Sequence, residues 1–98
     1  MKLKAGKKTY TLKYGIRAYI LFEKIADKPF SIDGITDWVL LAYAMLLAGT
    51  PDADITLDEF IDSVSEEELN KAIQYATKLM AVERQLGKEE DPDEVKKK

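Results

Sequence analysis

The stretch Trp-Val-Leu-Leu-Ala-Tyr-Ala-Met-Leu-Leu-Ala at residues 38–48 decides the fold of this chain. Its 11 residues are apolar on nearly every side of a helix, whereas a helix that crosses a bilayer needs about 18–20 such residues. A helix of this kind is either the centre of a core or gives one face to a partner. We therefore expect a largely buried helix over about 35–48, with Gly49 directly after it and Pro51 preventing its continuation.

This helix is expected to hold more apolar surface than the core of so small a chain easily covers. Part of the surface would then be shared with another chain. The partner-binding residues that we predict on the helix are Trp38, Leu41 and Met45. For Trp38 and Leu41 taken individually, burial in the core of the single chain is the interpretation that we favour, whereas for the helix as a whole we favour some exposure to a partner.

Upstream of this helix, residues 2–14 have the pattern of a β-hairpin. Ala5-Gly6-Lys7 supplies the turn, because Gly6 adopts positive φ without strain. Apolar side chains alternate along the second arm, which places them on one face against the helices that follow: Tyr10, Leu12 and Tyr14. The next stretch, 16–26, has apolar residues at helical spacing, and Pro29 ends the helix.

Two capping boxes mark the helices downstream. Each begins with Thr or Ser and has Glu three residues later: Thr56 with Glu59, and Ser65 with Glu68. They open a short helix over about 57–64 and a long amphipathic helix over about 66–86, which Gly87 is expected to end. The candidates for the N-cap of the central helix are Ser31, Asp33 and Thr36.

Together these elements predict an α+β fold that is mostly α, with an N-terminal β-hairpin packed on a bundle of about four helices. Residues 1–86 are expected to form a single domain, which is long enough to build a core without disulfides. Residues 87–98 are charged, and Val95 is their only large apolar side chain. Such a segment cannot bury enough surface to offset its ordering entropy, so we expect a disordered tail.

Composition excludes several classes of chemistry. The chain has no Cys and no His, which removes disulfides, thiolate nucleophiles, Cys-based zinc sites and the usual general base near pH 7. The basic N-terminus contains no apolar run of the length that a secretory signal needs, so we expect a cytoplasmic protein without a membrane anchor.

Residues 52–60 have acids in the arrangement of the second half of an EF-hand calcium loop. With Glu59 at the twelfth position, the loop would begin at Ala48, which has no side-chain oxygen, and would put Ala53 where the turn needs Gly. Asp58 and Asp62 share a helix face, but two solvated carboxylates both stay ionised. We therefore predict no metal site, no cofactor, no catalytic residue and no enzyme. A divalent-ion-binding accessory domain is the alternative.

Charge is segregated along the chain. Residues 1–17 hold six Lys or Arg and no acid, whereas residues 52–68 hold eight acids and no Lys or Arg. A basic hairpin with interleaved tyrosines is one way to grip single-stranded nucleic acid. The whole chain is nevertheless acidic, with a formal charge of -3, and no helix carries a basic recognition face. Nucleic acid is therefore the alternative partner and not the preferred one.

The layout as a whole carries a family resemblance. A Lys-rich opening leads directly into a helix, Lys-Leu-Lys-Ala-Gly-Lys-Lys-Thr-Tyr-Thr-Leu-Lys-Tyr-Gly-Ile-Arg-Ala-Tyr-Ile-Leu-Phe-Glu-Lys at 2–24. Leu-Leu-Ala-Tyr-Ala follows at 40–44, then Thr-Leu-Asp-Glu-Phe at 56–60 and a closing amphipathic helix. Over most of residues 2–86 this layout resembles the small tail assembly chaperones of long-tailed bacteriophages and prophages.

The resemblance implies a role without catalysis in the cytoplasm of a bacterial host. Such chaperones are thought to coat the long helical tape measure protein and keep it soluble until tail tube protein polymerises around it. The implied partners are therefore the tape measure protein, tail tube protein and further copies of the chain itself. The family has no catalytic motif, so the resemblance assigns no site residue.

Overall fold

The chain folds into a short hairpin followed by helices, and the computed structural model describes residues 1–90, with side chains described for residues 1–82. The hairpin consists of β1 (Lys2–Ala5) and β2 (Lys8–Thr11). Four helices follow in the described residues: α1 (Ile16–Ala26), α2 (Ile35–Gly49), α3 (Leu57–Ser63) and α4 (Glu66–Glu90). This confirms the α+β, mostly α fold with an N-terminal hairpin that the sequence predicts.

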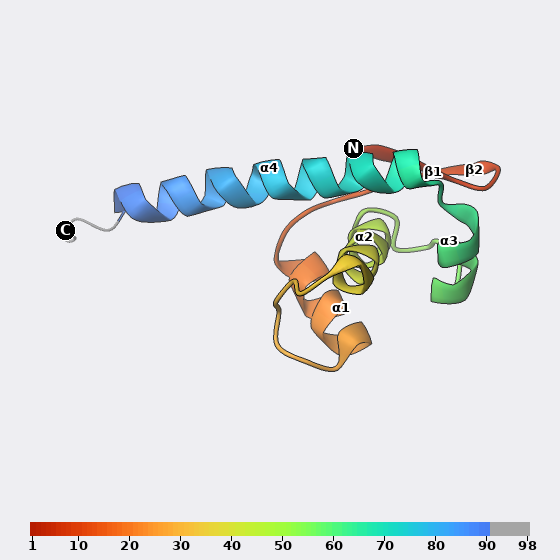
Figure 1. Cartoon of the computed structure of the whole chain (residues 1–98), viewed down its shortest axis with the longest axis horizontal. Coiled ribbons are helices and arrows are strands. Elements are labelled where there is room, and N and C mark those ends of the chain that lie inside the picture. Colours follow the sequence, from red (N-terminus) through yellow and green to blue (C-terminus); the bar gives the residue numbers. More distant parts are fainter. Residues whose placement is uncertain (91–98) are drawn as a thin grey trace.

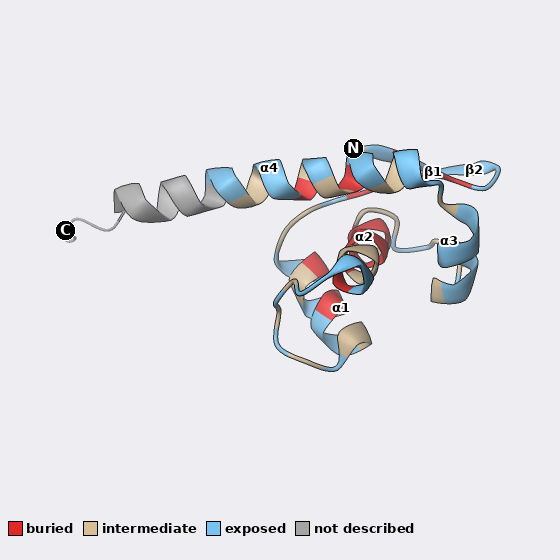
Figure 2. Cartoon of the chain, in the orientation of Figure 1, coloured by how far each residue is buried: buried red, intermediate tan, exposed pale blue. Residues whose placement is uncertain are grey.

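Helix α2 is the centre of the fold. It lies between α1 on one side and α4 with the hairpin on the other, and α3 also contacts it (Figure 1). Residues 41–46 of α2 are all buried, and Figure 2 shows how buried positions gather where the elements meet this helix. The prediction of a central buried helix is confirmed, because neighbours cover α2 on several sides.

The hairpin presents its apolar face to the helices. Its strands pair antiparallel, with Leu3 opposite Tyr10, and Gly6 takes the positive φ of 67° that the turn requires. Three of its side chains, and that of the residue directly after β2, are buried in the core: Leu3, Ala5, Tyr10 and Leu12. The second strand ends at Thr11 and not at the expected Tyr14. The Lys13 N–H donates to the Met45 carbonyl of α2 at 3.0 Å and is therefore not available to pair with β1.

The outer edge of β1 is covered by the junction between α3 and α4. The backbone N–H of Lys4 donates to the Glu68 carboxylate at 2.8 Å, and the N–H of Gly6 donates to the Ser63 carbonyl at 3.1 Å. The capping box at Ser65 is therefore only half formed. The Ser65 hydroxyl accepts from the Glu68 N–H as predicted, but the Glu68 carboxylate binds the strand. The box of Thr56 and Glu59 is complete.

The two ends of α2 differ from the expected caps. Gly34 is the N-cap, and none of the three predicted side chains (Ser31, Asp33 and Thr36) caps the helix. Gly49 is the last residue of the helix and not the residue after it. A Cβ at Gly49 would overlap the Thr11 carbonyl oxygen and lie 2.8 Å from its carbonyl carbon. Close packing of α2 on β2 is therefore what requires glycine here.

Helix α4 runs past its predicted end. It continues through Gly87 to Glu90 and projects beyond the rest of the fold (Figure 1). A helical glycine costs about 1 kcal/mol relative to alanine but does not by itself end a helix. Residues 87–90 belong to α4. The other residues of the predicted tail, 91–98, lie outside the described residues, so the disordered tail stays a prediction.

Candidate functional site

The three residues predicted to bind a partner lie at different depths. Leu41 is 0% exposed and Met45 is 1% exposed, so both side chains are enclosed by this chain's own core. Trp38 is half-buried and packs against the core from its edge. In this conformation Leu41 and Met45 present no surface to a partner because the neighbours of α2 cover them. Contact through Trp38 stays a prediction.

Among residues 1–82, two of the five exposed large hydrophobic side chains lie together on the outer face of α1, whereas α2, α3 and α4 each have one: Ile35, Ile61 and Val82. Ile16 is 74% exposed and Ile20 is 48% exposed, one helical turn apart on the same face. The opposite face carries Ala18 and Phe22, which are buried where α1 packs against α2. We call Ile16, Ile20 and the two basic residues beside them, Arg17 and Lys24, the α1 face.

The α1 face is hollowed as well as apolar. Ile16, Ile20 and Leu21 line a surface hollow of about 310 Å³ together with Arg17 and Lys24. A second hollow of about 160 Å³ lies next to it, shares Ile16 and Arg17, and adds Lys13 and Ala48. Within residues 1–82, Lys13, Arg17 and Lys24 take part in no ion pair. The face therefore combines aliphatic surface with a free positive rim.

Aromatic packing fixes α1 in place behind this face. The hydroxyls of Tyr14 and Tyr19 are hydrogen-bonded to each other. The Tyr19 ring lies 4.4 Å from that of Phe30 between centroids, and the Phe22 ring meets Phe30 edge-on at 5.2 Å. Such pairs add to the free energy of burial and restrict the orientation of α1. The isoleucines of the α1 face thus lie on a helix whose position is fixed by these ring contacts.

An ion pair holds the segment that leads from α1 into α2. The Lys28 ammonium donates to the Asp37 carboxylate at 2.7 Å, and the same oxygen accepts the Asp33 N–H at 2.8 Å. The Lys28 ammonium first, and then the Asp33 N–H, hold the pKa of Asp37 below its usual value. The same contact raises the pKa of Lys28. The ionised pair therefore helps to hold α1 in its position on α2.

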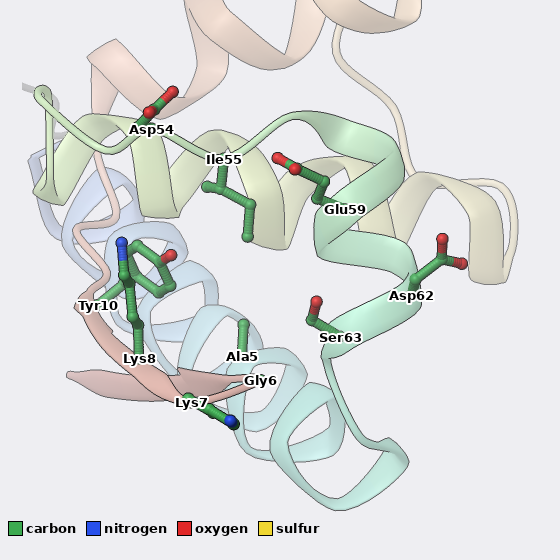
Figure 3. Close-up of a pocket in the computed structure, with 10 residues that line it drawn as sticks. All are labelled: Ala5, Gly6, Lys7, Lys8, Tyr10, Asp54, Ile55, Glu59, Asp62 and Ser63. Atoms are coloured by element: carbon green, nitrogen blue, oxygen red, sulfur yellow. The ribbon is translucent and has the colours of Figure 1, made fainter.

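An open cleft of about 370 Å³ lies between the hairpin turn and α3 (Figure 3). Lys7 and Lys8 come from the hairpin, and Glu59 and Asp62 come from α3. The Glu59 carboxylate already accepts the Thr56 N–H, and Asp62 points away from the hairpin (Figure 3). The cleft thus has a basic wall and an acidic wall, and its acids do not converge on one point.

Two observations bear on the alternative ligands considered from sequence. Among residues 1–82, no three acidic side chains come together as a metal site would need. Tyr10, the aromatic residue in the middle of the basic hairpin, lines the cleft but is only 8% exposed, which leaves little of its ring for a base to stack on. Among the described residues, no helix has the length and apolar character to span a membrane.

In comparisons with known proteins, no protein-family model, no curated protein and no solved structure matches this chain.

Proposed function

We propose that this protein is a binding protein without catalytic activity that serves as a tail assembly chaperone of a phage or prophage. Its client would be the tape measure protein, held in the cytoplasm of the bacterial host until tail tube protein assembles around it. The observation that carries the proposal is the α1 face, where two isoleucines one turn apart are exposed beside a hollow of about 310 Å³.

An amphipathic client helix suits the shape and chemistry of this face. Helix-in-groove recognition buries apolar anchors spaced three or four residues apart in an aliphatic groove. Ile16 and Ile20 have the same spacing on α1, so a client helix packing along them would bury both. Arg17 and Lys24 would favour acidic residues that flank the client's apolar stripe, which adds selectivity and speeds association.

Co-expression with the tape measure protein of the same genome tests the proposal. Wild-type protein is expected to keep the client in the soluble fraction and to co-purify with it. A variant with both Ile16→Asp and Ile20→Asp is expected to lose the client, because two carboxylates would have to be desolvated in the interface. Val82→Asp is the matched control, since Val82 is 44% exposed on α4 and lies outside the α1 face.

Circular dichroism of each variant establishes that helix content and thermal midpoint are retained. Full retention of the client by the double variant would contradict a role for the α1 face. Failure of the wild-type protein to solubilise the tape measure protein would contradict the chaperone proposal itself. A gene position between those for a tail tube protein and a very long tape measure protein is the expected genomic arrangement.

A further inference from the structure

A second exposed apolar position lies on α3, and acids surround it. Ile61 is 49% exposed, although Phe60 beside it is fully buried against α2. Asp58 lies one turn earlier on the same side and Asp62 follows directly, both exposed. Within residues 1–82 neither carboxylate takes part in an ion pair. We call Ile61, Asp58 and Asp62 the α3 face.

The α3 face matches the α1 face in both apolar character and charge. One offers a protruding isoleucine between two carboxylates, and the other offers a hollow between Ile16 and Ile20 with Arg17 and Lys24 at its rim. Helices α1 and α3, which carry the two faces, lie on different sides of α2 (Figure 1). Apolar contact with opposite charges around it is the usual composition of a specific interface.

We propose that the α1 face of one copy binds the α3 face of a second copy, with Ile61 seated in the hollow between Ile16 and Ile20. The two partners use different surfaces, so the interaction is head to tail. In an open assembly, an unoccupied α1 face remains at one end and an unoccupied α3 face remains at the other. Repetition of such a contact gives a ring or an open helical array.

This inference goes beyond the proposed function because it requires no client. It also assigns a consequence to that function, since a copy seated on the α1 face would exclude a client helix from the same surface. Without a client, the α1 face of each copy would be covered by the α3 face of another copy. Client binding would then compete with self-association.

Mixing two variants tests the head-to-tail arrangement directly. Ile20→Asp removes the α1 face and leaves the α3 face intact, whereas Ile61→Asp does the reverse. Sedimentation velocity is expected to show each variant alone as a single chain, although the wild-type protein associates as its concentration rises. A mixture of the two variants is expected to give one-to-one dimers that grow no further, because each dimer has one intact interface and two blocked ends.

Other outcomes would overturn the proposal. A wild-type protein that stays a single chain at the highest attainable concentration would exclude the contact. Association of either variant alone would show that a different surface, or the same surface on both copies, forms the interface. A mixture that remains monomeric would show that the two faces do not bind each other. Val82→Asp is the control and is expected to associate like the wild-type protein.

A charge exchange provides a second set of variants that does not alter the isoleucines. Arg17→Glu with Lys24→Glu, and Asp58→Lys with Asp62→Lys, are each expected to abolish association because like charges then face each other. Placing all four substitutions in one chain is expected to restore it. Absence of this restoration in a chain with native helix content would contradict the pairing of the two faces. Raised salt is expected to weaken the wild-type association.

Discussion

Helices α1 and α2 carry similar apolar side chains but use them in opposite ways. Helix α2 is the most apolar segment of the sequence, and residues 41–46 are sealed inside the chain. Helix α1 is shorter and packs against α2, so its outer isoleucines remain in water. The number of elements that surround a helix thus decides its exposure more than its own hydrophobicity does. The pair of exposed isoleucines lies on the peripheral helix.

The largest expected difference between the two helices is in stability. Leu41→Ala is expected to lower the free energy of unfolding by about 2–5 kcal/mol, because it leaves a cavity at a fully buried site. Ile20→Ala on the outer face of α1 is expected to change it by no more than about 0.5 kcal/mol. Urea denaturation of both variants measures the contrast. Equal losses at the two positions would show that the outer face of α1 is packed in the single chain.

Gly49→Ala tests the contact that fixes the end of α2 on the hairpin. We expect a loss of about 1–3 kcal/mol, since the added methyl group meets the Thr11 backbone and the helix must shift to accommodate it. Alanine is otherwise the better helix former, so a stability gain would contradict the close approach. Gly34→Ala is the control. An added Cβ there meets no atom within 4 Å, and its loss is expected to stay below about 1 kcal/mol.

The smallest expected effect concerns the link between α1 and α2 and depends on pH. The pKa of Asp37 is lower in the folded chain than in the unfolded chain, so folding gains stability from the ionised carboxylate above the unfolded pKa of about 4. That contribution is lost as the pH falls through the lower folded pKa. Asp37→Asn is therefore expected to lose less stability than the wild-type protein as the pH falls below about 4.

Urea denaturation at several pH values measures this difference. Glu68 also has a lowered pKa, first through the Lys4 N–H and then through Lys71, and it titrates in both proteins. Only the difference between the two pH profiles therefore reports on Asp37. Parallel profiles would show that the Lys28 contact does not contribute to holding the two helices together.

Local signals in the sequence predicted the elements well. The spacing of apolar residues gave α1 its bounds at 16–26, and the box of Thr56 and Glu59 fixed the start of α3. The partner-binding prediction instead concentrated on α2, where Leu41 and Met45 are enclosed. Periodicity shows that a helix has an apolar face but does not show how many neighbours will cover it.

The contacts that were missed join residues far apart in the chain. Glu68 had the spacing of a capping box, but Lys4 of β1 competes for its carboxylate across 64 residues. Gly49 had the position of a helix terminator, but its real requirement is the approach of Thr11. The sequence contains one signal from which the α1 face could have been predicted: two isoleucines four residues apart, with Arg17 and Lys24 beside them.

The central claim is that the outer face of α1 is free in the single chain and becomes covered when chains associate. Methyl NMR with a soluble paramagnetic gadolinium chelate measures this for each isoleucine, with Val82 as the reference. In dilute protein, the Ile16, Ile20 and Ile61 methyl signals are expected to broaden as strongly as those of Val82. At high concentration all three isoleucines, but not Val82, are expected to gain protection. Protection of Ile16 and Ile20 in dilute monomer, or no change on concentration, would contradict the account.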